Sequence, residues 1–232
     1  MEKEVENKIV PTVPADNALG PVGIQNPEEY LSEVFADADG LQLEFMKINT
    51  PTAGGTIFEI EDPTTGNTAP MKTLDCVILK SFPSNVMYLD DYDGTAVPPD
   101  CSSNDGVIGI DKDGNEHECA RCTYNQFGSG KNGGKACKNR RLLYVLLDGE
   151  QIPRVINLPS TSLSNLAKFQ TQVLMSRKRL RDYRVLISLT KATSKTNIPY
   201  SNYVFATAGL LENPEDIARV NDAMALLAAL GK

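Results

Sequence analysis

Residues 101–141 read CSSNDGVIGIDKDGNEHECARCTYNQFGSGKNGGKACKNRR and hold four of the five cysteines of this 232-residue chain. The four cysteines have the spacing C-x17-C-x2-C-x14-C and are Cys101, Cys119, Cys122 and Cys137. A CxxC turn places two thiolates about one tetrahedral edge apart, so one Zn²⁺ can bind both. Two thiolates from the flanking segments would complete a structural site, because no position is left open for water. The stretch therefore predicts one structural Zn²⁺ per chain.

The single histidine of the chain lies two residues before the CxxC pair. Because a neutral imidazole also binds zinc, His117 is a substitute for one of the four cysteines. The alternative for the whole group is a set of free thiols. Cys76 lies apart, in the apolar run LDCVILK, and is expected to be a buried strand residue.

Composition limits the cellular setting. The 41% hydrophobic content is ordinary for a globular protein. No run of about 18 apolar residues occurs, so we expect no membrane-spanning helix, and the N-terminal MEKEVENKIVPTV lacks the apolar core of a signal peptide. We therefore expect a cytoplasmic protein with no membrane partner, in a compartment where clustered cysteines favour a metal over disulfides.

Charge is unevenly distributed along the chain, although the net charge is −7. Residues 1–100 carry 18 acidic and 5 basic side chains, whereas residues 119–211 carry 15 basic and only 3 acidic ones. Such segregation can create a strongly positive face on an acidic protein, and a phosphate backbone meets this local field. The alternative is that the acidic part folds back and neutralises the basic part.

The order of expected elements favours a mainly β, α+β fold. Residues 1–25 are expected to form a flexible acidic arm, and a short helix is expected after Asn26. Strands are expected at 41–49, 56–62, 73–82, 86–92, 140–149, 152–159, 181–194 and 200–211, with a small hairpin over 106–118. One internal helix is expected within 158–180, and a C-terminal helix capped at Asn213. We predict a single domain over 26–232, an OB-like antiparallel barrel with a zinc subdomain inserted at about 98–140.

Several catalytic motifs can be compared with the sequence. Zinc deaminases need an H-x-E unit and a separate P-C-x-x-C, whereas here Glu118 directly follows His117 and also directly precedes Cys119. The segment GSGKNGGK resembles a phosphate loop in composition only, because no hydroxyl residue follows the lysine. One histidine also leaves little material for acid–base or nucleophilic catalysis. We therefore expect a protein that is not an enzyme.

Two basic clusters contain interleaved aromatic residues. Cations that follow a phosphate backbone, together with aromatic faces that stack bases, are typical of proteins that bind single-stranded nucleic acid. The first cluster comprises Arg121, Tyr124, Phe127, Lys131, Lys135, Lys138, Arg140, Arg141 and Tyr144. The second comprises Lys168, Arg177, Lys178, Arg179, Arg181, Tyr183, Arg184, Lys191, Lys195, Tyr200 and Tyr203. We expect single-stranded DNA as the ligand, with RNA as an alternative; the opposing interpretation is that the tyrosines pack in the core and the charges are solvated.

A second function from another class fits the same features. A zinc-stabilised adaptor could dock its basic face on an acidic protein partner. Stacking on tyrosine and phenylalanine distinguishes the two, because a nucleic acid needs these rings and an acidic protein does not.

The pattern C-x-x-C-x4-F-G-S-x4-G-K-x-C-K, which begins at Cys119, resembles one in single-stranded DNA-binding proteins encoded by phages and mobile elements. The arrangement of a zinc subdomain within an OB-fold is similar to that of the helix-destabilising protein of T-even phages. The resemblance implies an accessory role in DNA replication or recombination, with replication or recombination proteins as partners, in the host cytoplasm. It also implies zinc on the four cysteines of residues 101–137. The zinc spacing differs from the T-even pattern, and the C-terminus ALLAALGK lacks an acidic tail for recruiting partners.

Overall fold

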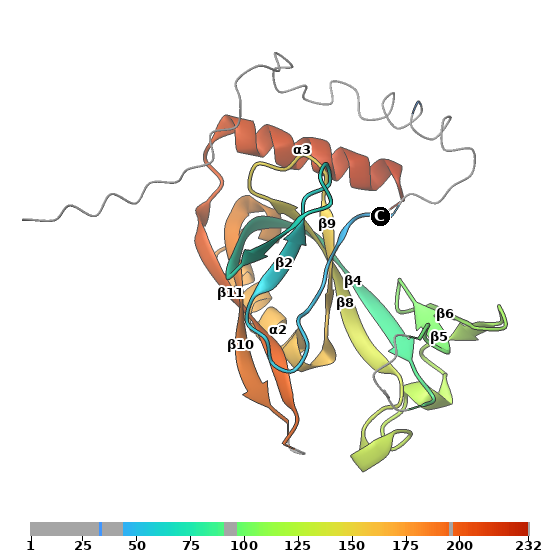
Figure 1. Ribbon diagram of the computed structural model, residues 1–232. Helices are drawn as coiled ribbons and strands as arrows, with labels where there is room; N and C mark the ends of the chain where they lie inside the picture. Colours follow the sequence, from blue (N-terminus) through green and yellow to red (C-terminus); the bar gives the residue numbers. More distant parts are fainter. Residues whose placement is uncertain (1–32, 34–43, 91–96, 195–196, 232) are drawn as a thin grey trace, which may run out of the picture.

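The computed structural model describes residues 33, 44–90, 97–194 and 197–231 (Figure 1). The predicted arm at 1–25 and most of the short helix after Asn26 lie outside this part of the chain, as does Lys195. The described residues form a mainly β, α+β structure, which confirms the predicted class. None of the helices in the described ranges is long and apolar enough to cross a bilayer.

One large sheet organises the molecule. Its hydrogen-bonded order is β1-β9-β8-β4-β5-β6-β7, and β10 joins β4 as a branch that carries β11. A separate hairpin pairs β2 with β3. The strands are β1 (Lys47–Ile48), β2 (Phe58–Glu61), β3 (Thr68–Met71), β4 (Thr73–Met87), β5 (Cys101–Ser103), β6 (Ile108–Asp111), β7 (Glu116–Glu118), β8 (Lys138–Leu147), β9 (Arg154–Leu158), β10 (Tyr183–Thr193) and β11 (Pro199–Leu210).

Strand β4 is the axis of the sheet and links its two parts. One edge pairs with β8 along most of its length. The other edge pairs with β10 at residues 73–76 and with β5 at residues 85–87. Pro83 lies between these two stretches, where that edge has no strand neighbour, so its missing N–H breaks no ladder on that side. The two strands predicted at 73–82 and 86–92 are therefore one continuous strand up to Met87.

The main core lies on the concave side of the sheet. Alternate residues of β4, β8 and β9 supply Ile78, Val145 and Ile156, all fully buried. Helix α2 (Leu163–Met175) covers them with Leu166 and Phe169. Because side chains of a strand point alternately to the two faces, this one set of strands also builds a second core on its other side.

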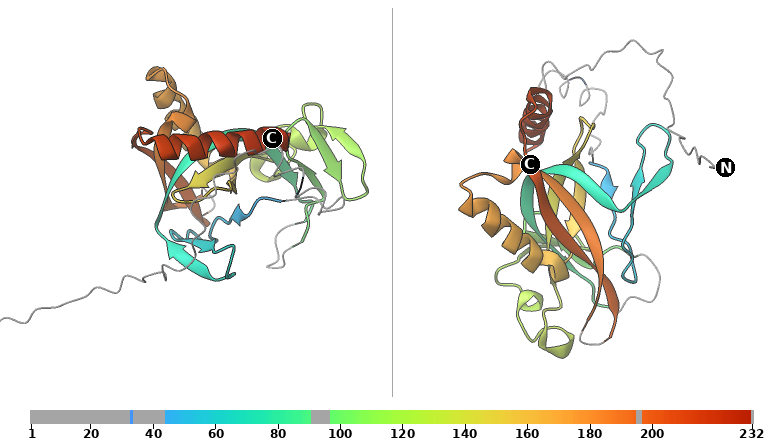
Figure 2. Two further views of the ribbon diagram at one scale, coloured as in Figure 1. Left: turned by 90° about the horizontal axis from the view of Figure 1, so that it is seen from above. Right: turned by 90° about the vertical axis from the view of Figure 1, so that its left-hand side faces the viewer.

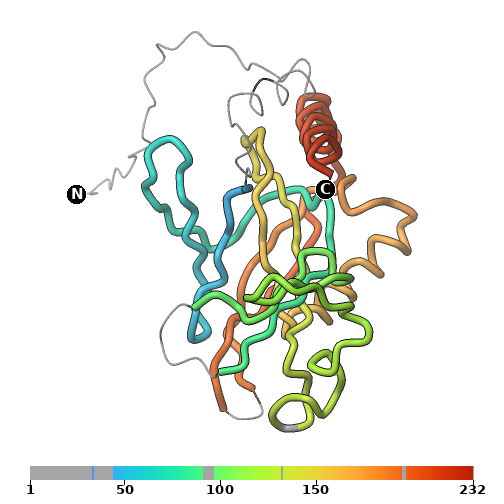
Figure 3. The backbone as a smooth tube through the Cα atoms, turned by 90° about the vertical axis from the view of Figure 1, so that its right-hand side faces the viewer, coloured from blue at the N-terminus to red at the C-terminus, as the bar shows by residue number. Residues whose placement is uncertain are grey.

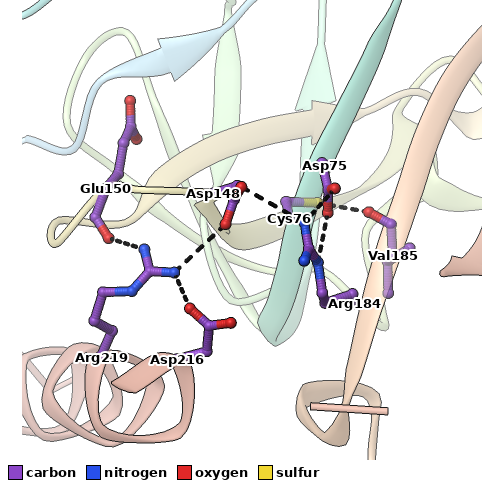
Figure 4. A network of polar contacts seen from close by, with 8 residues as sticks. All are labelled: Asp75, Cys76, Asp148, Glu150, Arg184, Val185, Asp216 and Arg219. Atoms are coloured by element: carbon purple, nitrogen blue, oxygen red, sulfur yellow. Dashed lines mark hydrogen bonds and ion pairs between the residues drawn. The ribbon is translucent and has the colours of Figure 1, made fainter. Parts of the chain in front are cut away.

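Helix α3 (Pro214–Ala229) covers the outer face of β4, β8 and β9, as Figure 1 shows along the top of the sheet. The helix begins as predicted at Asn213, whose side chain accepts a hydrogen bond from the Glu215 backbone N–H. Arg219 then binds the sheet: its guanidinium donates to the Glu150 carbonyl at 3.1 Å and lies 3.5 Å from Asp148 (Figure 4). Asp148 also lies 3.5 Å from Arg184, so the network joins α3 to β10.

The described strands do not close into a barrel, so the predicted OB-like antiparallel barrel stays a prediction beyond its α+β class. Strand β1 runs parallel to β9, and no hydrogen-bond ladder joins β9 to β11 within the described part of the chain. The segment after β1 bridges the gap through side chains instead. Tyr203 and Ser201 of β11 reach it, with the Tyr203 hydroxyl 2.8 Å from the hydroxyl of Thr50. The sheet therefore encloses its core without closing its ladder.

Candidate functional site

Three short strands at the far end of β4 bring the first two cysteines together. In the register of β5, β6 and β7, Cys101 pairs with Asp111, and Gly109 pairs with His117. Cys119 follows His117 by two residues, so both lie on the same face. A Cβ on Gly109 would lie 2.9 Å from the Cys101 Sγ and 3.6 Å from the Cys119 Sγ. The missing side chain of Gly109 thus leaves room for two sulfur atoms.

The other two cysteines join this pair through backbone hydrogen bonds. The Asn125 N–H donates to the Cys122 carbonyl at 3.0 Å, which closes the turn after the CxxC pair. The Cys137 N–H donates to the Tyr124 carbonyl at 2.9 Å and holds Cys137 beside that turn. All four cysteines line one pocket of about 570 Å³. The fold therefore brings together four cysteines of which the first and last are 36 residues apart in the sequence.

Three asparagines and a lysine fix this arrangement to the sheet. The Asn139 side-chain amide donates to Asn85 at 2.6 Å and to Asn125 at 3.0 Å. The Lys135 ammonium donates to the side-chain oxygens of Asn125 and Asn139. Since Asn85 is on β4 and Asn139 on β8, the cysteine loops are tied to the two longest strands of the sheet's centre.

The thiols influence one another electrostatically. Burial raises the pKa of Cys101 and of Cys137, and the neighbouring thiols of Cys119 and Cys122 raise the pKa of both further. All five cysteines are free. Cys76 is buried in the main core, as predicted, and burial raises the pKa of its thiol as well.

The geometry falls short of a closed metal site. Across residues 44–90, 97–194 and 197–231, no group of three or more His, Cys, Asp or Glu side chains stands in a ligating arrangement. The fold supplies a shared pocket and a gap at Gly109 that sulfur atoms occupy from two sides. Four thiols that line one pocket fit the preference of Zn²⁺ for thiolate ligands. Zinc binding remains a prediction.

His117 lines the same pocket as the four cysteines and already has a hydrogen-bond partner there. Its Nε2 lies 2.8 Å from the Asp111 carboxylate, and this hydrogen bond is the largest of the effects that hold the pKa of Asp111 well below its usual value. An imidazole that already has a carboxylate partner must break that contact to bind a metal through the same nitrogen.

Part of the first basic cluster forms an exposed rim on the cysteine loops. Phe127 is 83% exposed and Tyr124 is 43% exposed. The Lys135 ammonium lies 5.3 Å from the centre of the Phe127 ring, a cation–π distance. Lys131 and Lys138 are exposed on either side of this loop. The rim therefore presents two accessible rings among cations.

The remaining residues of the first cluster are less available. Arg121 is exposed and lies 3.5 Å from Glu118. Arg141 is half-buried and donates two hydrogen bonds to Ser81, and Arg140 is half-buried on the same strand.

Only part of the second basic cluster lies together: Lys178, Arg179 and Arg181 line one pocket of about 350 Å³. Arg177, Lys178 and Arg179 follow the end of α2, and Arg179 pairs with Asp182. Arg184 pairs with Asp75 at 2.6 Å near α3, so part of the basic segment is neutralised. The other members lie elsewhere: Lys168 on α2, Tyr183 at the start of β10, and Lys191 and Tyr200 on the β10–β11 hairpin. The sequence cluster is therefore not one patch.

Two of the predicted aromatic contacts are wrong because the rings are buried. Tyr203 is fully buried and packs on Phe58, and burial raises its pKa to about 12. Tyr144 is 5% exposed and makes edge-on contacts with Phe45 and Phe82 beside α3. Their rings do not reach a ligand on the surface.

Gly109 and the asparagine network were not among the predicted site residues. Gly109 interrupts the apolar run VIGI, and a glycine inside a strand often marks close approach of another group. Asn85 has a similar signal, since it stands between buried residues of a strand. A buried amide there needs partners, and Asn139 supplies one.

No protein-family model, no curated protein and no solved structure matches this chain.

Proposed function

We propose that this protein binds single-stranded nucleic acid, with DNA as the expected ligand, through an OB-like barrel and a zinc-stabilised insertion, and that it catalyses no reaction. As an expectation from the sequence resemblance, this binding would serve DNA replication or recombination. The proposal rests on strand order, on the position of the insertion and on the exposed aromatic rim.

The strand order supports an OB-like assignment. Strands β4, β8 and β9, helix α2, and strands β10 and β11 follow one another in the chain. Strand β4 pairs with both β8 and β10, and β10 with β11, which makes a five-stranded antiparallel set with a single internal helix. In this assignment the parallel strand β1 occupies the edge of β9 where the barrel would otherwise close.

The insertion lies where OB-folds bind oligonucleotides. Ligands of OB-folds contact the loop between the first two strands and the loop between the last two. Here the first loop is the insertion, residues 88–137, and the second is the turn between β10 and β11. Figures 1 and 3 draw both at the same end of the molecule. A strand of nucleic acid could therefore contact both loops.

The single observation that carries the proposal is Phe127. Its ring is 83% exposed, so covering it with a ligand would remove apolar surface from water, and the Lys135 ammonium lies 5.3 Å from the ring centre. Bases stack on exposed aromatic rings, and their phosphates attract the same cations that line this loop. No acidic residue occurs between Cys119 and Leu147, so nothing in that segment opposes a polyanion.

Zinc has a structural role in this proposal. The ion would be held by Cys101, Cys119, Cys122 and Cys137. Its bonds to the four sulfurs would stabilise a loop that is too small to form a hydrophobic core of its own. Through the Cys122 turn and Cys137, the ion would fix the loop that carries Tyr124 and Phe127.

The test is a fluorescence titration of the full chain with labelled oligo-dT, matched RNA and matched duplex, at two salt concentrations, with zinc quantified in the same sample. We expect tight binding of oligo-dT that weakens steeply with salt, because counterions are released from the phosphates. About one zinc per chain is expected. A protein that carries zinc but binds none of the three nucleic acids contradicts the proposal and favours the protein adaptor.

A further inference from the structure

The outer side of the β5–β6–β7 sheet is apolar and exposed. Ile108 and Ile110 of β6 are 38% and 54% exposed. In the strand register, Ile108 pairs with Glu118 and Ile110 with Glu116, so two carboxylates flank the isoleucines. We name these four residues the hairpin surface. Gly109 lies on the opposite face of β6, toward the sulfurs of Cys101 and Cys119, although Glu116 and Glu118 also border the pocket that the cysteines line.

A second surface has the complementary character. In the last turn of α2, Leu174 is 72% exposed and Met175 is 81% exposed. The helix ends after them, and Arg177 adopts a left-handed conformation with φ 57°. Arg177 and Lys178 are exposed next to the two apolar residues. We name these four residues the helix tip.

We propose that the hairpin surface of one copy of this chain docks on the helix tip of another. Exposed branched and unbranched apolar side chains on each side provide the area to bury, and clusters of this kind mark interaction sites. Glu116 and Glu118 make the hairpin surface negative, whereas Arg177 and Lys178 make the helix tip positive. Such charge complementarity selects the partner and its orientation. Both halves of the interface are present in the same chain, which favours a second copy over an unrelated protein.

The two surfaces cannot meet within one molecule. Figure 2 draws the hairpin and the end of α2 projecting from separate places on the surface. An interface between two different patches is heterologous, so each docked pair leaves one surface of each kind free. The assembly therefore grows into an open chain, or into a ring where the rotation between copies closes it. It does not depend on nucleic acid, although along a bound strand it would line up neighbouring molecules.

Sedimentation equilibrium of the full chain without nucleic acid, over a range of concentrations at low and high salt, tests the inference. We expect an average mass that rises steadily with concentration beyond that of two chains, and less so at high salt, because the charges that attract each other are screened. The paired change Glu116→Lys and Glu118→Lys is expected to weaken self-association by at least about tenfold, since like charges then face each other. The paired change Arg177→Glu and Lys178→Glu is expected to do the same.

The combined variant decides the matter. With all four charges reversed, the two surfaces are complementary again, and self-association should recover. The control is Glu59→Lys with Glu61→Lys, which reverses two exposed carboxylates at the same spacing on β2 and should change nothing. Thermal unfolding of each variant checks that it is folded.

Three results would overturn the inference. One is the mass of a single chain at every concentration; another is a closed dimer that no charge reversal affects; the third is a hairpin surface that binds a different protein while the chain itself stays monomeric. Because nucleic acid is absent from this experiment, a failure to bind oligo-dT would contradict the proposed function and leave this result intact.

Discussion

The two halves of the insertion share a set of cysteines but differ in almost everything else. Residues 101–118 carry five acids and one base, and they form three strands with exposed isoleucines. Residues 119–137 carry three bases and no acid, and they form turns with exposed aromatic rings. The difference shows how a small insertion can present two unlike surfaces when its cysteines tie both halves together. In our two proposals, the first half contacts protein and the second half contacts nucleic acid.

The largest expected effect comes from breaking the shared centre. The double change Cys119→Ser and Cys122→Ser should abolish zinc binding and weaken oligo-dT binding by more than about tenfold, because metal binding in small sites is coupled to folding. Metal analysis and a fluorescence titration measure both. The control is Cys76→Ala in the main core, which should cost roughly 1–3 kcal/mol of stability and retain the zinc. If the serine variant bound oligo-dT normally, the two halves would not depend on a metal.

The second half alone is tested by Phe127→Ala. Removal of the exposed ring should weaken oligo-dT binding by about 1–3 kcal/mol, the value of one stacked base, without changing thermal stability. Tyr144→Phe is the matched control, because this buried ring remains in place and loses only its hydroxyl. An unchanged affinity for oligo-dT in the alanine variant would mean that no base stacks on Phe127.

Gly109→Ala tests the gap between the halves. The new Cβ would lie 2.9 Å from the Cys101 Sγ, and crowding of this kind typically costs about 1–3 kcal/mol. We expect weaker zinc binding in a competition with a chelator. The control, Gly134→Ala in the same insertion, meets only ordinary contact at 3.4 Å from the Lys131 carbonyl. Equal zinc affinity in the two variants would mean that Gly109 does not border the metal.

Salt dependence separates the charges of the two halves. Lys131→Gln and Lys138→Gln should each lower the slope of log affinity against log salt by roughly 0.7, the value for one phosphate contact on a single strand. Lys112→Gln in the acidic half should leave the slope unchanged, because Lys112 lies near Asp100 rather than on the basic loop. If Lys112→Gln lowered the slope as much as the other two changes, nucleic acid would contact both halves of the insertion, and the proposed division between them would be wrong.

The smallest effect is expected at His117. Since four cysteines already fill a tetrahedral zinc site, His117→Ala should leave the zinc content at one per chain. If metal analysis showed that the His117→Ala variant had lost the ion, His117 would be a ligand and one of the four cysteines would not bind the metal.

Much of the fold could be predicted from local patterns. The apolar alternation of β10 and β11 and the start of α3 at Asn213 are local features, and the structure confirms them. The internal helix is shorter than predicted, since it ends before Arg177, where the chain turns into a left-handed conformation. The strand β3, Thr68–Met71, is missing from the predicted strands, because its only strand signal is its pairing with β2.

Part of the candidate site could likewise be predicted from the sequence, and part of it could not. Cysteine spacing predicted which segments meet, and the shared pocket agrees with it. The availability of each aromatic ring could not be predicted. Phe127 and Tyr203 both stand near basic residues in the sequence, yet one is exposed and the other fully buried. Burial depends on which face of a strand meets the core, and that is decided by partners far along the chain.

By itself, the sequence determined the mainly β class, the position of α3, and the segregation of charge that leaves residues 119–147 without an acid. Only the tertiary structure decided that β4 pairs with β5, β8 and β10 in one sheet. It also decided that Tyr144 and Tyr203 are buried, and that the residues of the second basic cluster are spread over several elements. The physical reason is range. Periodicity, capping and composition act within a few residues, whereas register and burial depend on contacts such as that of Thr50 with Tyr203, which no local pattern contains.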